Sequence, residues 1–474
     1  MNIIRTPQLD SPGPLVVRGL NWLGDAVISF PAIRAIKRFN PSRELVCVSR
    51  PGAADVYESL DAFSTVIAEE RPVLSRLALA MKLRALKPAG MLVLPNSLST
   101  GLLAKVTNAP VRIGRAKNLR SVFLTKAVTF TPQEEAAHET FKFLRLVSEL
   151  GLPSPYTRPA IARPCQPDGF SLPEGLRLAL APGASYGTAK RWPAESFAQA
   201  AKLILEGRKG GVVILGTQAE SQAAKDAQDA LKGVPETLNL AGQLSVKEVI
   251  AVLSCCHLTL CNDSGLMHLS AALDVPVVAM FGPTNPVKTS PLARRGTVLR
   301  NPAPCSPCRY RDCPKANRIC FDGLTPDLVA TAATNLLVPF RNSRKTVIWS
   351  PTADQIWPLQ PIAGVNFYAS ATEIAKAGGQ PATAPSWMKI VWQPLETAND
   401  WWGLIHAAKL DPSTAFWVGD TERSITLANA TGGRSVLVTT LRAQKIIPDL
   451  LANGTTPTIA APDAEKSMDW IASF

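Results

Sequence analysis

Long apolar runs are absent from this sequence of 474 residues. No stretch approaches the roughly 18 consecutive apolar residues of a membrane-spanning helix. The opening residues MNIIRTPQLDSPGP also lack the basic-then-apolar pattern of a secretory signal. With 46% hydrophobic residues, 18% charged residues and a mean hydropathy of +0.08, the chain is not of the disordered class. We therefore expect a cytoplasmic globular protein, which at this length divides into two or three domains.

Two common nucleotide-binding signatures are missing from the first strand, loop and helix. Neither GxGxxG nor GxxxxGK(S/T) occurs there, which argues against an ordinary dinucleotide-binding fold or a P-loop. The chain also lacks a zinc-finger helix and an RNP-type aromatic strand. Nucleic acid is therefore not the expected partner.

Acidic residues are outnumbered in the first 340 residues. That part holds 39 Lys and Arg against 26 Asp and Glu, whereas residues 341–474 hold 11 of each. The net charge of +13 therefore lies in the N-terminal part, where it favours a polyanionic partner such as an anionic membrane surface or a phosphorylated glycolipid. The alternative is that this charge only promotes solubility.

Alternating strand and helix patterns run through the chain. An apolar run at 14–18 precedes a helical pattern over 26–38, and a proline-rich stretch from 153 to 173 leads to a second series of strands and helices. All nine Cys precede residue 321 and eight of the ten Trp follow residue 340, which indicates a separate unit after Phe340. We expect α/β architecture with two Rossmann-like domains facing a cleft and a smaller third α/β domain. The expected domains are 1–155, 156–340 and 341–474.

The loop 21–25 after the first strand carries an acid at the start of a helix. Gly24 allows the backbone to approach a ligand closely. Asp25 either caps the helix or points into the cleft as a catalytic group, and the sequence alone leaves both roles open.

The loop 181–193 joins a strand to a helix and combines small residues, hydroxyls and cations. Ser185, Tyr186 and Lys190 in this position suit a diphosphate at a helix N-terminus. A solvated basic loop is the alternative.

The loop that begins at Cys261 also follows a strand and opens a helix. Asp263 can cap this helix, Ser264 and Gly265 can offer a hydroxyl and backbone N–H groups to phosphate oxygens, and His268 is either structural or part of the site. Together with the loop 281–286, these loops are expected to converge on one anionic ligand.

Taken together, these blocks resemble the ADP-heptose:lipopolysaccharide heptosyltransferases of Gram-negative bacteria, glycosyltransferase family 9, and most of all its type II members. The resemblance covers about the first 340 residues and implies the two-domain GT-B fold. The blocks that carry it are RGLNWLGDAVISFPAIRA (18–35), LPNSLSTGLLAK (94–105), APVRIGR (109–115), LAPGASYGTAKRWP (180–193), NLAGQLSV (239–246) and NDSGLMHLSAALDVPVVAMFGPTNPVKTSPL (262–292).

The resemblance implies an inverting transfer of heptose from ADP-heptose to the inner-core heptose of lipopolysaccharide. Asp25 matches the family's general base, and Lys190 would stabilise the departing ADP without a metal or other cofactor. The first domain would bind the acceptor and the second the donor, at the inner leaflet of the inner membrane. Positions that match the family's contacts to the nucleotide sugar are Gly24, Ser185, Tyr186, Glu220, Asp263, Ser264, Gly265 and His268.

Four cysteines, Cys305, Cys308, Cys313 and Cys320, lie within sixteen residues. Four close thiols suit a structural zinc ion, but the usual pair of CxxC knuckles is missing. Reduced or paired thiols without metal and an iron–sulfur site are the other possibilities. Similar clusters occur in type II members of the family.

The segment 415–440 of the third unit is similar to the terminal motif of haloacid-dehalogenase-like (HAD-like) phosphatases. Gly419 and Asp420 match, but that family's second acid falls on Ser424, and its nucleophile pair falls on Ser350 and Thr352. The resemblance therefore implies a degenerate phosphatase-like domain used for stability, dimerisation or docking.

Three alternatives to the type II transferase stay open on the sequence. One is a type I enzyme that acts on Kdo2-lipid A, and another is a bifunctional transferase and sugar phosphatase. The third is a non-catalytic scaffold, against which the intact Asp25, Lys190 and NDSG block argue.

Overall fold

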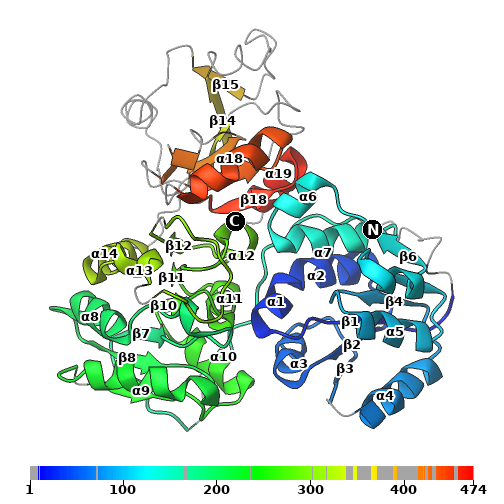
Figure 1. Cartoon of the computed structure of the whole chain (residues 1–474), viewed down its shortest axis with the longest axis horizontal. Coiled ribbons are helices and arrows are strands. Elements are labelled where there is room, and N and C mark those ends of the chain that lie inside the picture. Colours follow the sequence, from blue (N-terminus) through cyan, green and yellow to red (C-terminus); the bar gives the residue numbers. More distant parts are fainter. Residues whose placement is uncertain are drawn as a thin grey trace.

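The chain folds into three α/β units, each built on a parallel six-stranded sheet. This computed structural model describes residues 9, 11–70, 73–164, 169–234, 236–301, 303–315 and 318–337 and, beyond 344, residues 345–349, 365–370, 388–391, 415–419, 421, 425–426, 428–429, 434–452 and 457–472. In Figure 1 the first and second units lie side by side, and the third unit lies across both of them.

The first unit has the strand order β3-β2-β1-β4-β5-β6. Its central strands are buried over their whole length, as expected for a parallel sheet covered by helices on both faces. The strands are β1 (Leu15–Arg18), β2 (Leu45–Ser49), β3 (Thr65–Ala68), β4 (Gly90–Val93), β5 (Val111–Arg115) and β6 (Lys126–Val128). The helices are α1 (Leu23–Ile28), α2 (Phe30–Phe39), α3 (Pro51–Glu58), α4 (Val73–Ala85), α5 (Leu98–Val106), the 3-10 helix η2 (Asn118–Phe123), α6 (Pro132–Ala136) and α7 (Glu139–Ser148).

The second unit repeats this topology, with the order β12-β11-β10-β7-β8-β9. The strands are β7 (Leu176–Ala181), β8 (Gly210–Ile214), β9 (Thr237–Asn239), β10 (Leu258–Asn262), β11 (Val277–Met280) and β12 (Gly296–Leu299). The helices are η3 (Thr188–Lys190), α8 (Ala194–Leu205), η4 (Gln218–Glu220), α9 (Ser221–Ala230), α10 (Val246–Ser254), α11 (Gly265–Ala272), α12 (Pro286–Thr289), α13 (Ile319–Asp322) and α14 (Pro326–Leu337).

The third unit has the order β15-β14-β13-β16-β17-β18. Its strands are β13 (Lys345–Trp349), β14 (Val365–Ser370), β15 (Met388–Val391), β16 (Ala415–Gly419), β17 (Arg434–Val438) and β18 (Ile459–Ala461), and its helices include α18 (Leu441–Ala452) and α19 (Ala464–Ala472). The expected fold class, two GT-B-type sheets and a smaller α/β unit, is therefore confirmed. The exact boundaries at 155 and 340 stay a prediction.

The single helical pattern expected over 26–38 is in fact two helices. Ser29 separates α1 from α2, and its hydroxyl donates to the carbonyl of Ala26 at 2.7 Å. Pro31 lies in the first turn of α2, where its missing N–H costs no intrahelical hydrogen bond. The apolar period continues across this break, so periodicity alone could not detect it.

The three units meet at a closed set of hydrogen bonds. The His138 Nε2 lies 3.0 Å from the Ser290 carbonyl of the second unit, and the Ser290 hydroxyl donates to the Thr458 carbonyl of the third unit at 3.1 Å. The His138 backbone N–H donates to the Ala460 carbonyl at 2.9 Å. Burial lowers the pKa of His138 to about 3, so this junction uses a neutral imidazole.

Apolar packing adds to this junction. Val287 of α12 is fully buried in one cluster with residues of the third unit, namely Ile425, Leu437, Ala443, Leu450 and Ala460. The third unit is thus attached to both other units rather than tethered to one. In the part of the chain that the structure describes, no helix has the length and apolar character needed to cross a membrane.

Candidate active site

The predicted site loops leave the carboxyl ends of central strands in both sheets. β1 lies between β2 and β4, and β7 and β10 are neighbours in the second sheet. The loop that follows β1 leads into α1, and the loop after β10 leads into α11. In open parallel sheets ligands bind at such positions, where the strand order reverses. Figure 1 shows α1 and α11 facing each other across the boundary between the two units.

Gly24 of α1 lies directly against the start of α11. A Cβ atom on Gly24 would stand 2.7 Å from His268 Cδ2 and 3.3 Å from Gly265 Cα. A Cβ on Gly265 would in turn stand 2.8 Å from Leu23 Cδ2. Both glycines therefore let the two units approach closely, whereas the contacts to a ligand expected of Gly24 and Gly265 stay a prediction.

Asp25 lies on α1, at the boundary between the first and second units. It lies in the first turn of α1, where Trp22 and not Asp25 occupies the N-cap position. Burial raises the pKa of Asp25 to about 6, and the negative charges of Glu139 and Asp263 also raise it, whereas Lys190 lowers it. A carboxyl with this pKa is ionised at neutral pH but binds a proton readily, as a general base must.

Lys190 and Asp263 form a buried ion pair. The Lys190 ammonium lies 2.7 Å from Asp263 Oδ2, which also accepts a hydrogen bond from Thr284 Oγ1 at 2.7 Å. Asp263 is thus held between two loops and does not cap α11, contrary to that expectation. The pair links the end of β10 to the loop after β7. It therefore holds the Lys190 ammonium next to Asp263 instead of leaving it extended into solvent.

The N-terminus of α11 has free hydrogen-bonding capacity. Ser264 is its N-cap residue, and this residue makes no side-chain capping bond. The Ser264 hydroxyl is buried and has no hydrogen-bond partner among the described residues. An unpaired buried hydroxyl beside unpaired helix N–H groups is an arrangement that suits a phosphate oxygen.

His268 lies one turn into α11 and is 5% exposed. Burial lowers the pKa of His268 to about 4; the charge of Asp263 raises it and that of Lys190 lowers it. The imidazole is therefore neutral at pH 7 and packs on Gly24 as a hydrogen-bonding group without charge.

Ser185 and Glu220 pair with each other. The Ser185 hydroxyl donates to Glu220 Oε1 at 3.0 Å, and Glu220 Oε2 accepts from the Thr217 amide and hydroxyl in a capping box. A Cβ on Gly183 would stand 2.6 Å from Glu220 Cβ. The structure thus brings these two predicted residues together, with the carboxylate occupied by local partners.

Tyr186 and the Cys-rich segment brace the Lys190 loop. The Tyr186 hydroxyl donates to the Arg309 carbonyl at 2.8 Å, and Lys190 lies 4.9 Å from the centre of the Tyr186 ring. Thr188 donates to Asp312 at 2.7 Å, and the Ala189 N–H also bonds to this segment. The segment 305–320 therefore positions the loop that carries Lys190.

The four clustered cysteines are free thiols that line one small cavity of about 20 Å³. The pKa of Cys320 is raised to about 11, chiefly by burial and to a smaller extent by the other three thiols. Among the described residues no group of three or more His, Cys, Asp or Glu side chains is arranged to hold a metal ion. The zinc, metal-free thiol and iron–sulfur alternatives therefore all stay predictions.

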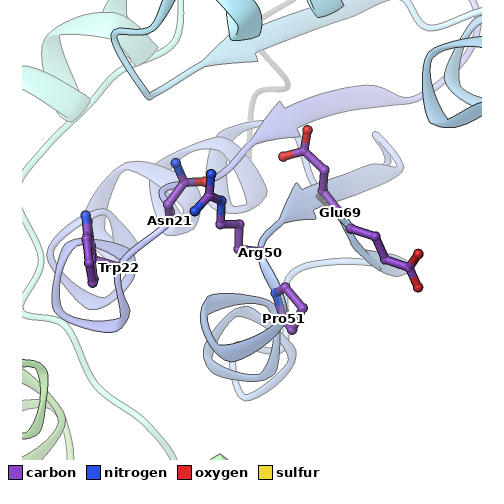
Figure 2. A pocket seen from close by; sticks show the side chains of 6 residues that line it. Asn21, Trp22, Arg50, Pro51 and Glu69 are labelled. Carbon is purple, nitrogen blue, oxygen red and sulfur yellow. The ribbon is translucent and has the colours of Figure 1, made fainter. Parts of the chain in front are cut away.

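A pocket of about 510 Å³ lies in the first unit beside α1 (Figure 2). Its lining comes from the loops after β1, β2 and β3, that is, from the same sheet edge as Asp25. The lining residues are Asn21, Trp22, Arg50, Pro51, Glu69 and Glu70.

Buried charges build the inner wall of this pocket. Arg18 bonds to Glu69 Oε2 at 2.5 Å and to Asn21 Oδ1 at 2.9 Å. Trp22 is 58% exposed, although it directly precedes α1. The pocket therefore combines buried, paired charges with an exposed indole.

Several residues of the site were not singled out from the sequence. Thr284 lies in the predicted loop 281–286, but no sequence pattern indicated its hydrogen bond to Asp263. Asn262 links the end of β10 to the loop 181–193. Its side-chain N–H donates to the Pro182 carbonyl at 2.8 Å, and its side-chain oxygen accepts from the backbone N–H of Trp192 at 2.9 Å. Glu139 acts on Asp25 from α7, and no sequence motif indicated this.

A profile of glycosyltransferase family 9 (heptosyltransferase) matches residues 76–318. The chain belongs to glycosyltransferase family 9. As a member of family 9 it is a glycosyltransferase of the heptosyltransferase type, which confirms the resemblance noted in the sequence.

Individual relatives of this family 9 chain agree with that placement. Lipopolysaccharide heptosyltransferase 2 of Salmonella typhimurium is 29% identical over 307 residues, 60% of this chain and 87% of the relative. Lipopolysaccharide heptosyltransferase 1 of Pseudomonas aeruginosa is 32% identical over 181 residues, 33% of this chain and 49% of the relative. The solved structure of Escherichia coli ADP-heptose lipopolysaccharide heptosyltransferase II is 25% identical, with a TM-score of 0.59 over 69% of this chain and 98% of that one.

Proposed function

We propose that this protein transfers heptose from ADP-heptose to the inner-core heptose of lipopolysaccharide, the type II reaction. One observation carries the proposal: Asp25, with its raised pKa, lies at the boundary of the two units within electrostatic reach of the Lys190–Asp263 pair. The relatives named heptosyltransferase 2, and the solved heptosyltransferase II, support the type II choice.

In this reaction Asp25 takes the proton of the acceptor hydroxyl as its oxygen attacks the anomeric carbon of the donor. The bond from that carbon to the phosphate oxygen breaks on the opposite face, and its electron pair leaves with ADP. The configuration is therefore inverted. Closure of the two units around the reactants excludes water, which limits hydrolysis of the donor.

The departing diphosphate gains negative charge, which the second unit is built to receive. Lys190 supplies a fixed positive charge, and the N-terminus of α11 supplies N–H groups and the unpaired Ser264 hydroxyl. These groups provide charge stabilisation from the protein itself, so we propose that the reaction needs no metal. Ser185, Tyr186, Glu220 and His268 would shape the nucleotide-sugar pocket.

The acceptor sugar would occupy the pocket of the first unit shown in Figure 2. The exposed Trp22 offers an aromatic face for a sugar ring, and it lies three residues before Asp25 on the same turn. Arg50 and Asn21 offer donors to hydroxyl or acidic groups. The enzyme would work at the inner leaflet of the inner membrane, where its basic first part meets a phosphorylated lipid acceptor.

The third unit would be a degenerate HAD-like domain with a structural role. In its sheet β13 and β16 are neighbours, and these are the two strands that directly precede the segments resembling the phosphatase motifs. Ser350, Thr352, Asp420 and Ser424 lie outside the described residues. The replaced acids in the sequence and the attachment to both other units support a structural rather than a phosphatase role.

Mass spectrometry of products tests the proposed acceptor. Purified protein and ADP-heptose would be mixed with Kdo2-lipid A, either bare or already carrying one heptose. A heptose gained only by the heptosylated acceptor supports the type II reaction. A heptose gained by the bare acceptor assigns type I instead, and release of phosphate from heptose bisphosphate with magnesium would reveal phosphatase activity.

A further inference from the structure

The outer edge of the first unit exposes an unusual number of apolar side chains. Helix α5 contacts both α4 and η2, so the three helices form one surface. Of the ten exposed large hydrophobic residues in the described part of the chain, seven lie on these helices or directly after α4. They are Leu77, Met81, Leu86, Leu98, Leu102, Leu119 and Val122. Their exposed fractions range from 39% to 75%, which makes this surface the main apolar one.

The same surface is strongly basic. Residues 71–133 contain eleven Lys and Arg and no Asp or Glu, so this window carries most of the net charge of +13. Five of the cations are exposed and pair with no carboxylate among the described residues. They are Lys82, Arg84, Lys87, Lys105 and Lys117.

This basic apolar face adjoins the pocket proposed for the acceptor. Arg76, in the first turns of α4, forms an ion pair at 3.3 Å with Glu69, which lines that pocket. Leu98 opens α5 directly after the loop from β4, at the sheet edge where the pocket lies. A molecule anchored on the face could therefore present a sugar to the pocket.

We propose that the α4–α5–η2 face docks on the surface of an anionic lipid bilayer. Its leucines enter the boundary between head groups and acyl chains, while the lysines bind lipid phosphates and extend their charges outward. A second copy of the chain is a poor occupant, because two such faces would bring only like charges together. Single-stranded nucleic acid is equally poor, because the exposed residues are aliphatic and offer no stacking surface.

The proposal rests on the proposed function in one respect only, that the acceptor is lipid-linked. Docking would place Asp25 and the pocket next to the membrane without a spanning segment. The enzyme would then meet its acceptor by diffusion along the surface rather than by extracting it from the bilayer.

Co-sedimentation of the full chain with vesicles tests the docking face. The probes are vesicles of phosphatidylcholine with or without phosphatidylglycerol. The wild type should bind only the anionic vesicles, and less well at high salt. The triple variant Lys82→Gln, Arg84→Gln, Lys87→Gln should bind about 100-fold more weakly, since each surface cation contributes about fivefold. The double variant Leu98→Ser, Leu102→Ser should lose about tenfold or more.

Matched controls change the same residue types on exposed positions of the second unit. Lys202→Gln, Lys225→Gln, Lys232→Gln controls for charge, and Leu328→Ser controls for apolar exposure. The proposal expects both controls to bind like wild type. Binding that falls equally in the controls, or vesicle binding that none of these variants weakens, would overturn it.

A water-soluble, deacylated acceptor separates docking from catalysis. The face variants should keep kcat/KM on this acceptor within about twofold of wild type but lose activity on acceptor embedded in anionic vesicles. A loss on both acceptors would assign the helices to the active site and overturn the docking role. If the wild type binds vesicles as expected yet transfers to neither acceptor, the proposed function fails and the docking face stands.

Discussion

Gly24 and His268 lie against each other across the boundary of the two glycosyltransferase units, with room for a hydrogen atom but not for a methyl group. A Cβ on Gly24 would stand 2.7 Å from His268 Cδ2. Because His268 is buried and packed in α11, the added atom would push α1 away from the donor site rather than displace a mobile side chain.

Gly24→Ala should therefore lower kcat by about tenfold or more through displacement of Asp25, with the fold retained. Gly52→Ala in α3 is the matched control, because its Cβ would meet nothing within 4 Å. Steady-state kinetics and thermal melting of both variants check this. Equal kinetics in Gly24→Ala and Gly52→Ala would show that the close approach is not needed for transfer.

The pH profile should report the ionisation of Asp25. Since the base must be ionised to accept a proton, kcat/KM should rise with pH through about 6 and level off above it. Removing the charge of Lys190 (Lys190→Met) should move this limb to higher pH, and Glu139→Gln should move it to lower pH. Glu206→Gln, on an exposed residue of the second unit, should leave it in place. A profile that no variant moves would exclude Asp25 as the titrating base.

The same pKa has a consequence for stability. Folding raises the pKa of Asp25 from 3.8 to about 6, so Asp25 contributes stability at low pH that is lost as the pH rises through about 6. Asp25→Asn should thus be more stable than wild type at pH 8, by about 1–2 kcal/mol, and this difference should shrink toward pH 5. Chemical unfolding at both pH values measures it. A destabilised Asp25→Asn variant at pH 8 would contradict the burial assigned to this carboxylate.

A double-mutant cycle on Lys190 and Asp263 measures how strongly the two side chains are coupled in ADP binding. Asp263→Asn leaves the ammonium without its ionic partner, and Lys190→Met leaves a buried carboxylate whose remaining hydrogen bond comes from Thr284. Each should weaken ADP binding about tenfold or more, with a coupling energy of about 1 kcal/mol or more. Isothermal titration calorimetry with ADP gives the four affinities. Strict additivity would mean that the two side chains act on the nucleotide independently.

Trp22 should matter for the acceptor and not for the donor. Trp22→Ala removes the exposed indole of the pocket, so the acceptor KM should rise by about tenfold while ADP affinity stays unchanged. Trp22→Phe keeps an aromatic face and should recover part of the loss. If Trp22→Ala alters only the donor affinity, the acceptor does not use this pocket.

Val287 tests the attachment of the third unit. Val287→Asp places a carboxylate in the apolar cluster with Leu437 and Leu450, at a cost of about 3 kcal/mol or more. We expect a separate, lower melting transition for the third unit and faster hydrogen exchange at the His138 amide, which bonds to Ala460. Leu328→Asp, on an exposed position of α14, is the control and should melt as wild type does. A single unchanged transition in Val287→Asp would show that this contact does not hold the third unit.

The rule that sites form at the carboxyl ends of parallel strands predicted which loops of the site come together. Asp25, Lys190, Asp263 and His268 all lie in the loops that follow buried strands or in the helices that those loops open, and parallel strands bring their carboxyl ends to one edge. The partner of Asp263 could not be predicted in this way. A local rule assigns an acid before a helix to capping, whereas the ion pair with Lys190 spans 73 residues of chain and depends on how two loops fold together.

Other features depend on packing between units and therefore left no sequence motif. The acid Glu139 acts on Asp25 from a helix more than a hundred residues away, and the junction of His138 with Ser290 and β18 joins three separate sheets. The break between α1 and α2 was hidden because the apolar period continues through Ser29. The basic apolar face needed the arrangement of α4, α5 and η2, since only the fold shows which leucines are exposed.

The most direct test of the central claim compares wild type with Asp25→Asn in one assay that follows both products. Purified protein, ADP-heptose and heptosylated Kdo2-lipid A are mixed, and ADP release and the mass of the acceptor are measured together. We predict that the wild type releases one ADP for each heptose added, and that Asp25→Asn slows the transfer by a factor of about 100 to 10,000 while still binding ADP. Unchanged transfer by Asp25→Asn, or ADP release by the wild type without any gain in acceptor mass, would contradict heptosyl transfer with Asp25 as its base.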